Sequence, residues 1–160
     1  MKIIKYSNKY QEDLKNLLVE LQEYIVSIDD WHLNILTPQY RELYFKKTIE
    51  ECHKRNGVIF IAVENNKAIG MIYGGIIEYD EYDKCDYACP KTGHIEELIV
   101  SKNVRHEGLG SKLLNKMEQY FKSLGCEYCH LNVFEPNNIG KNFYAMHNYI
   151  TRMCNLSKKL

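Results

Sequence analysis

Residues 95–110 read Ile-Glu-Glu-Leu-Ile-Val-Ser-Lys-Asn-Val-Arg-His-Glu-Gly-Leu-Gly. The first six residues are mostly apolar and partly β-branched, which predicts a strand that ends at Val100. A loop with two glycines follows, and a helical pattern begins at Leu109. The first N–H groups of a helix lack partners within it, the helix dipole adds positive charge there, and glycine lets an anion approach the main chain. The segment therefore predicts a phosphate-binding site, to which Arg105 adds a charged donor.

The residues after the loop follow a helical period as far as Gly125, which is typical of a helix end. Lysine and glutamate side chains occupy the opposite face of this helix. The apolar stripe consists of Leu109, Leu113, Leu114, Met117, Tyr120, Phe121 and Leu124.

Two helices are predicted before the main sheet. Residues 2–6 form a short apolar strand, and the helix after it ends near Asp29. Thr37 followed by Pro38 is typical of a helix start, and Gly57 of a helix end.

A hairpin precedes the decisive segment. Residues 58–63 are β-branched and aromatic, residues 65–67 are typical of a turn, and residues 68–77 form the returning strand. Residues 78–93 then carry acidic side chains among tyrosines, together with a proline and a glycine. They predict an exposed excursion between two strands.

The last third of the chain predicts a strand over residues 128–134, a helix from Asn137 to about His147 and a final strand over residues 149–156. Strands and helices mix along the chain without an internal repeat. We therefore predict a single α/β (α+β) domain over residues 1–160, long enough to bury a core without metal or disulfides.

Composition excludes several classes of partner. The 21 basic residues balance the 21 acidic ones, so no overall field favours nucleic acid or an anionic membrane. The N-terminus lacks the apolar stretch of a signal peptide, and no run approaches the length of a membrane span. The six cysteines are therefore expected to be reduced thiols, and the protein to be cytoplasmic.

Two common phosphate-binding motifs do not match the loop. A Walker motif requires Lys-Ser/Thr after its second glycine, whereas Gly110 is followed by Ser111 and Lys112 in the wrong order. The dinucleotide fingerprint requires three glycines, usually after the first strand of a domain. What remains is Arg-x-x-Gly-x-Gly after a strand in the middle of the chain.

Two blocks of this chain resemble the GNAT superfamily of N-acetyltransferases. The blocks are residues 95–100 with 105–114, and Asn132-Val133-Phe134 with Asn137 and residues 143–149. In this order and spacing they are similar to the family's acetyl-CoA motif and to its later strand and helix. The clear similarity covers about residues 58–156. It implies a mixed, mostly antiparallel central sheet of six to seven strands, flanked by about four helices, with splayed central strands.

The resemblance implies acetyl-CoA as cosubstrate, an amine as acceptor, and no metal. The pyrophosphate would lie on the backbone amides from Arg105 to Gly110. The pantetheine arm would pair with the exposed edge of the strand at Leu98, which a β-bulge splays from its neighbour. The implied acetyl-CoA-binding residues are Leu98, Ile99, Val100, Arg105, His106, Glu107, Gly108, Leu109, Gly110, Ser111, Asn137 and Tyr144.

Acetyl transfer to an alkyl amine needs a base, because the amine arrives mostly as an ammonium ion at neutral pH. Alternation predicts that side chains 94, 96 and 98 share one face of the strand and 95, 97 and 99 the other. The resemblance places the general base at Glu96, with His94 as the reserve candidate. The simpler interpretation is that Glu96 and Glu97 are polar side chains of an edge strand without a catalytic role. The family's proton donor to the leaving thiolate matches Tyr144, which packing alone could also explain.

Other functions remain open at this point. A non-catalytic acyl-CoA-binding module would keep the phosphate loop without needing Glu96 or Tyr144, and a nucleotide-binding regulatory domain could use the same loop. A homodimer is also left open. Acidic residues could hold a cationic acceptor such as a polyamine, an aminoglycoside or a lysine, although solvated loop charge explains them equally well. These residues are Glu78, Asp80, Glu81 and Asp83, with Asp29 and Asp30.

Three residues depart from the family pattern: His106, Gly140 and Asn148. Histidine at 106 leaves the backbone amides in place, and asparagine at 148 is tolerated because it enters the left-handed region easily. Glycine at 140 is expected to loosen the last helix. Cysteines at 126 and 129, and those at 85 and 89 near His94, lack the ligand set of a zinc site, so we predict no zinc.

Overall fold

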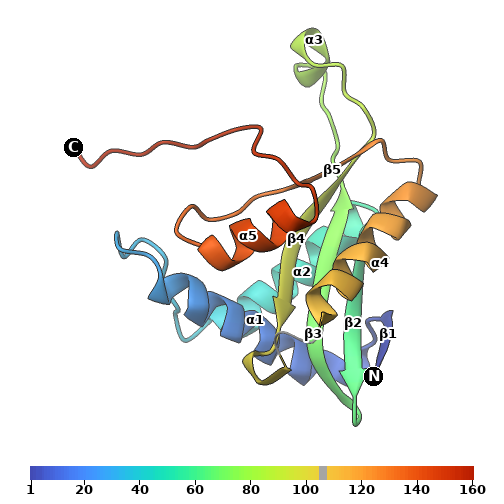
Figure 1. Cartoon of the computed structure of the whole chain (residues 1–160), viewed down its shortest axis with the longest axis vertical. Coiled ribbons are helices and arrows are strands. Elements are labelled where there is room, and N and C mark those ends of the chain that lie inside the picture. Colours follow the sequence, from blue (N-terminus) through green and yellow to red (C-terminus); the bar gives the residue numbers. More distant parts are fainter. Residues whose placement is uncertain (105–107) are drawn as a thin grey trace.

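The computed structural model describes residues 1–104 and 108–160. Over these residues, one five-stranded sheet lies between helices on both faces (Figure 1). Its strands are β1 (Lys2–Lys5), β2 (Val58–Glu64), β3 (Lys67–Ile76), β4 (Thr92–Val100) and β5 (Tyr128–Leu131). The helices are α1 (Gln11–Ser27), α2 (Tyr40–Lys54), α3 (Asp83–Asp86), α4 (Leu109–Ser123) and α5 (Asn138–Met146). Two short 3-10 helices are η1 (Asn8–Tyr10) and η2 (Lys102–Val104).

The sheet follows the chain in the order β1-β2-β3-β4-β5. The first four strands are antiparallel neighbours, and β5 pairs with β4 in parallel. The parallel pair needs a crossover, which α4 provides. The prediction of a mixed, mostly antiparallel sheet is therefore confirmed.

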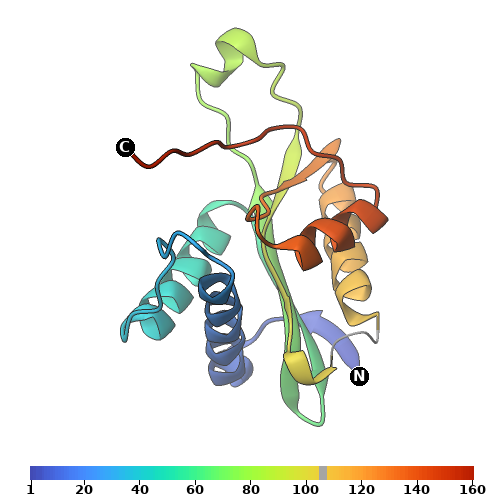
Figure 2. The ribbon, with the colours of Figure 1, turned by 60° about the vertical axis from the view of Figure 1, so that its left-hand side comes forward.

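Helices α1 and α2 cover one face of the sheet, and α4 and α5 cover the other (Figure 2). Strand β2 is buried on both faces because alternate side chains enter two different cores. Ile59, Ile61 and Val63 pack beneath α1 and α2. Val58, Phe60 and Ala62 pack beneath α4, with Leu113, Leu114 and Phe121 of that helix.

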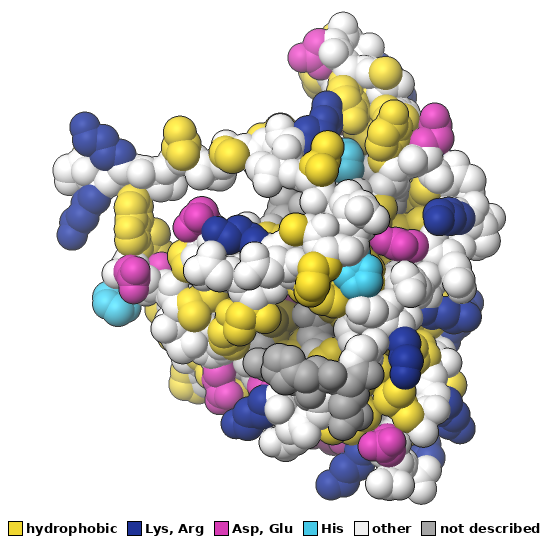
Figure 3. All heavy atoms as spheres, viewed as in Figure 1, with side chains coloured by type: hydrophobic (Ala, Val, Ile, Leu, Met, Phe, Trp, Pro, Cys, Tyr) yellow, Lys and Arg dark blue, Asp and Glu magenta, His cyan; other side chains and the backbone are white. Residues whose placement is uncertain are grey.

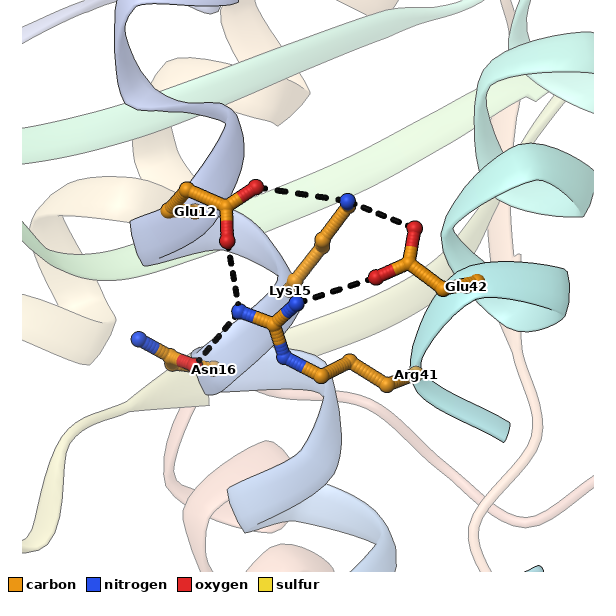
Figure 4. Close-up of polar contacts among 5 residues, drawn as sticks. All are labelled: Glu12, Lys15, Asn16, Arg41 and Glu42. Carbon is orange, nitrogen blue, oxygen red and sulfur yellow. Dashed lines mark hydrogen bonds and ion pairs between the residues drawn. The ribbon is translucent and has the colours of Figure 1, made fainter. Parts of the chain in front are cut away.

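A cluster of charges joins α1 to α2 (Figure 4). The Lys15 ammonium lies 2.6 Å from a Glu42 oxygen and 3.3 Å from a Glu12 oxygen. Arg41 completes the cluster, 2.8 Å from Glu12 and 3.0 Å from Glu42. Lys15 is 5% exposed, so these carboxylates satisfy a cation that has left most of its water. The cluster fixes the helix pair that faces β4.

Strand β4 contains a bulge. Tyr73 of β3 pairs with Glu97, and its neighbour Gly74 pairs with Ile95, so Glu96 is an extra residue without a partner on β3. This confirms the expected bulge. Such an insertion breaks the alternation of side chains. Accordingly, Ile95 packs in the core beneath α4, whereas Ile99 packs in the core beneath α1 and α2.

Strands β4 and β5 separate beyond the bulge. Their pairing runs from Thr92 with Tyr128 to Ile95 with Leu131, where β5 ends. Strand β4 continues to Val100. The predicted splay is thus confirmed, and it lies on the β5 side of residues 96–100.

The final strand predicted over residues 149–156 is wrong, and with it the count of six to seven strands. In the described residues the sheet has five strands, and the segment after α5 has no regular structure. This segment extends away from the body of the protein (Figure 3). Ile150, Met153 and Leu156 are 87%, 87% and 92% exposed, because no neighbouring strand covers them. The described residues form five α-helices rather than about four, since the excursion adds the one-turn α3.

The excursion between β3 and β4 is largely exposed, as predicted, and projects beyond the sheet with α3 at its tip (Figure 1). Among the described residues, no helix combines the length and the apolar character that crossing a membrane requires.

Candidate active site

The bulge directs two neighbouring carboxylates toward α2. Glu96 contacts Arg55 at the end of α2, and Glu97 contacts Tyr44 within it. Leu98 instead packs in the core beneath α4. The prediction that His94, Glu96 and Leu98 share one face of the strand is therefore wrong for Leu98. Glu97 lies on that face instead, because the extra residue of the bulge shifts the alternation of side chains by one.

The Glu96 carboxylate forms an ion pair with the Arg55 guanidinium. The two side chains are 27% and 26% exposed, so the pair stands at the wall of the site rather than in open solvent. The same Glu96 oxygen, Oε1, lies 3.2 Å from Nδ1 of His94. Among the described residues, no hydrogen bond reaches Oε2 of Glu96.

His94 is neutral at physiological pH. Burial, which is the largest cause, and the electrostatic effects of Arg55 and His130 together lower its pKa to about 4. Its Nδ1 is buried and forms no hydrogen bond of good geometry with the described residues, despite the nearby Glu96 oxygen. A neutral imidazole with so low a pKa is a weak base. The structure thus brings His94 beside Glu96, but in a poor state to accept a proton.

Glu97 is a residue that the sequence reasoning missed as a site residue. The Tyr44 hydroxyl donates a hydrogen bond to its carboxylate. Burial raises the pKa of Glu97, while the Tyr44 hydrogen bond and the charge of Lys47 oppose the rise. A Glu-Glu pair on a strand expected to bulge was the signal that both carboxylates could face the same side.

An inner cavity of about 140 Å³ fills the gap where β4 and β5 separate. Glu96, Glu97 and Tyr144 all line it, so the structure brings the predicted base and the predicted proton donor to one space. Burial raises the pKa of Tyr144, and the charge of Glu97 raises it further, so the phenol stays protonated. The other lining residues are Leu21, Gln22, Ile25, Tyr40, Leu98, Asn132, Val133, Phe134 and Asn137.

The predicted pantetheine strand has two kinds of side chain. Ile99 is 3% exposed and belongs to the core beneath α1 and α2. Leu98 and Val100 pack against the core on the other face, and Leu98 also borders the inner cavity. The buried side chain of Ile99 could therefore not reach a ligand arm, and a contact at this residue would use main-chain groups of the strand edge.

The start of α4 carries the glycines of the predicted phosphate loop. Gly108 precedes the helix with φ of 71°, a conformation that glycine adopts readily. A side chain at Gly110 would come within 3.3 Å of the Phe143 ring, so glycine there lets α5 pack against α4. The hydroxyl of Ser111 lies 2.8 Å from Nε2 of His147. Arg105, His106 and Glu107 lie outside the described residues.

Asn137 connects three parts of the site. Its Oδ1 accepts hydrogen bonds from the Gly140 N–H at 2.8 Å, which caps α5, and from the Tyr24 hydroxyl of α1 at 3.1 Å. The cap needs glycine at 140, because a Cβ there would lie 2.7 Å from Asn137 Nδ2. Asn148 has φ of 64°, which confirms the expected left-handed turn after α5.

An outer cavity of about 250 Å³ lies on the α2 side of Glu96. Five residues of the α2 side line it, and apart from Thr48 they are spaced by three or four positions: Tyr44, Lys47, Glu51 and Arg55. Sequence reasoning missed this stripe because it read only the apolar face of the helix. The spacing was the available signal, since residues three and four apart share one helix face.

The acidic residues considered for a cationic acceptor do not gather. The excursion with α3 and the segment after α1 lie apart in both views (Figures 1 and 2). Asp29 instead accepts the backbone N–H groups of Trp31, Leu33 and Asn34, which shape its own loop. Within the described part of the chain, no three His, Cys, Asp or Glu side chains are placed to hold a metal ion.

The family model described as the Acetyltransferase (GNAT) family matches residues 25–149, which is most of the chain. This chain belongs to the GNAT acetyltransferase family. The matched region contains α2, the bulged strand, the glycine loop and α5. The GNAT family uses acetyl-CoA as acetyl donor.

Solved structures share the GNAT fold at low sequence identity. A mutant of the BH1408 protein from Bacillus halodurans matches with a TM-score of 0.85 and 17% identity, covering 100% of this chain and 99% of that one. Glucosamine-6-phosphate N-acetyltransferase from Arabidopsis thaliana gives 0.64 and 22%, covering 99% and 97%. Aminoglycoside N-acetyltransferase AAC(6')-Iy, in complex with CoA, gives 0.67 and 16%, covering 99% and 100%.

Proposed function

We propose that this protein transfers the acetyl group of acetyl-CoA directly to a primary amine of a small molecule or peptide, with Glu96 as general base and Tyr144 as proton donor. The observation that carries the proposal is the inner cavity, which Glu96 and Tyr144 both line at the separation of β4 and β5. Family membership supports the acetyl donor.

The start of α4 would hold the donor's pyrophosphate. The amides of residues 105–110, with Ser111 nearby, are the proposed contacts. Of these, Gly108, Leu109 and Gly110 are described, and they form the start of a helix of 15 residues, where N–H groups lack helical partners. The edge of β4 beyond Ile95 would pair with the amide groups of the pantetheine arm.

Glu96 would accept a proton from the acceptor's ammonium group. The neutral amine nitrogen then bonds to the thioester carbonyl carbon, and the carbon–sulfur bond breaks as that nitrogen gives its second proton to solvent. Glu96 would return its own proton to solvent before the next turnover. A backbone N–H of β4 would polarise that carbonyl. Tyr144 would give its hydroxyl proton to the leaving sulfur and regain one from solvent. Because its pKa is raised, Tyr144 carries this proton throughout the neutral range.

The test measures release of the CoA thiol with polyamines, aminoglycosides, amino acids and peptides as acceptors. We expect Glu96→Gln to lower kcat by about 10²-fold or more, the usual contribution of a general base. Tyr144→Phe should lower it less, and calorimetry should show that both variants still bind acetyl-CoA. Tyr128→Phe is the control, because Tyr128 is exposed at the start of β5 and does not line the inner cavity.

Two outcomes would contradict the proposal. If both variants turn over at the rate of the unchanged protein, neither residue has its proposed role. If acetyl-CoA binds but no amine in the panel releases thiol, the protein is better described as a non-catalytic acyl-CoA-binding module.

A further inference from the structure

Helix α2 presents a polar stripe to the sheet beside its apolar one. Buried Cys52 packs in the core on the apolar side, whereas buried Thr48 lies beside the polar stripe and also lines the outer cavity. Tyr44, Lys47, Glu51 and Arg55 follow one another on the neighbouring side and line the outer cavity. A helix that packs on a sheet normally turns apolar residues toward it, so a polar stripe over a cavity indicates a binding wall.

The outer cavity carries charges of both signs. Its carboxylates are Glu51 and Glu96, and its cations are Lys47 and Arg55. Tyr44, Thr48 and Tyr73 complete the lining. A space of about 250 Å³ with both kinds of charge suits a small ligand that is itself both cationic and anionic.

The two cations differ in their partners. Arg55 is paired with Glu96, the proposed base. Lys47 has no carboxylate partner among the described residues, and its ammonium lies 5.4 Å from the centre of the Tyr44 ring. The Glu51 carboxylate lies 3.0 Å from the ammonium group of Lys54, a residue that does not line the cavity. The cavity therefore offers Lys47, which forms no ion pair with the described residues although its charge acts on Glu97, next to Arg55, which must exchange its partner before Glu96 is free.

We propose that the outer cavity selects acceptor amines that also carry an anionic group, a carboxylate or a phosphate, which Arg55 and Lys47 bind while the ammonium group meets Glu96. This inference rests on the proposed function, because it assigns the acceptor class of the same site. Arg55 and Lys47 are specificity-determining residues in this assignment.

An exchange of partners explains the selection. The ligand's anion replaces Glu96 on the Arg55 guanidinium, and the ligand's ammonium replaces Arg55 on Glu96. All four charges remain paired. An amine without the anionic group would leave the half-buried Arg55 unpaired as it takes Glu96, and an enzyme discriminates strongly against ligands that leave its polar groups without partners.

The experiment compares matched amines for binding to the protein saturated with CoA, by calorimetry. L-lysine is compared with cadaverine, which lacks the carboxylate, and phosphoethanolamine with ethanolamine, which lacks the phosphate. We expect the anionic member to bind about tenfold more tightly or better, the effect of one hydrogen bond to a charged group. The pair with the larger ratio identifies carboxylate or phosphate as the preferred anion.

Three variants test the residues. Lys47→Ala and Arg55→Ala should each reduce the preference for the anionic amine, the ratio of the two dissociation constants within a pair, to about onefold to threefold. Lys46→Ala should leave this ratio unchanged. Lys46 is the matched control because it is the neighbouring lysine of α2, outside the cavity lining and paired with Glu50. Circular dichroism checks that each variant is folded, and Lys47→Ala suffices should Arg55→Ala fail to fold.

The inference is overturned if neither anionic amine binds more tightly than its partner, or if the preference survives in Lys47→Ala. Because the readout is binding, its result is separate from that of the proposed function. Tighter binding of the anionic amines without release of the CoA thiol would support this inference and contradict acetyl transfer. Equal thiol release from cadaverine and from L-lysine would support acetyl transfer and contradict this inference.

Discussion

The Tyr44 hydroxyl donates a hydrogen bond to the Glu97 carboxylate, across 53 positions of sequence. This contact ties α2 to β4 next to the bulge. It also gives a half-buried carboxylate its one protein donor among the described residues. Because burial dominates and raises the pKa of Glu97, the folded protein holds a proton there more readily than the unfolded chain does.

Glu97→Gln should stabilise the protein increasingly as pH rises. A raised folded-state pKa gives stability that is present at low pH and lost as pH rises through that pKa. Glutamine keeps an oxygen that accepts the Tyr44 hydrogen bond but has no proton to lose, so the variant does not lose this stability as pH rises. Thermal unfolding of both proteins between pH 4 and 8 measures the difference. Glu50→Gln is the control on the exposed side of α2, and an equal pH dependence of Glu97→Gln and the unchanged protein would contradict the prediction.

His94 should make the protein sensitive to acid. Its pKa is lowered from 6.5 to about 4 in the folded state. The contribution of neutral His94 to the free energy of unfolding is therefore fully present above the pKa of this imidazole in the unfolded chain. It is lost as pH drops from about 6.5 toward 4. The full loss is about 3 kcal/mol, from the size of that shift.

Urea unfolding between pH 7 and 4 checks this prediction. His94→Gln should remove most of the extra acid sensitivity, whereas His53→Gln, at an exposed position of α2, should not. An NMR titration of the His94 imidazole in the native protein with a midpoint near 6.5 would show that the prediction is wrong.

Gly140→Ala should destabilise the protein although alanine favours helices. The new Cβ would lie 2.7 Å from Asn137 Nδ2 and disturb the cap of α5. We expect a loss of about 1 kcal/mol, the usual value of a helix cap. In an Asn137→Ala background the same substitution should instead stabilise by up to about 1 kcal/mol, the helix preference of alanine over glycine. Chemical unfolding of all four proteins gives the coupling, and effects that simply add would rule out the clash.

Lys15→Met should lower the melting temperature at neutral pH, because it leaves the Glu12 and Glu42 carboxylates without their buried cation. The hydrogen bond from Lys15 lowers the pKa of Glu42, so this stabilisation is present at neutral pH and is lost as pH falls through the folded pKa of that carboxyl. The gap between variant and unchanged protein should therefore narrow in acid. Lys46→Met, in an exposed pair with Glu50, serves as control; a gap that widens in acid would refute the prediction.

Sequence reasoning succeeded where the relevant forces are local. The hairpin, the exposed excursion and the helix after the glycine loop all occur as predicted. The left-handed Asn148 was also foreseen, because φ above zero is a property of one residue and its side chain.

The predictions from sequence failed where a neighbouring strand or the pairing register between strands decides the structure. The segment after Tyr149 has the composition of a strand, but a strand needs a neighbour, and none lies beside it in the described chain. Leu98 was assigned to the face of Glu96 because simple alternation was applied across the bulge. The bulge itself was expected, yet its position between Ile95 and Glu97 became clear only from the pairing with β3.

The sequence by itself determined a strand, a glycine loop and a helix over residues 95–124, and with them the GNAT family. These features depend on β-branched runs, glycines and a helical period, which are local properties of the chain. Only the tertiary structure decided that Glu96 meets Arg55 and that Glu97 meets Tyr44. Those contacts join residues 41 and 53 positions apart, and they exist because a bulge turned one strand where α2 docks against it.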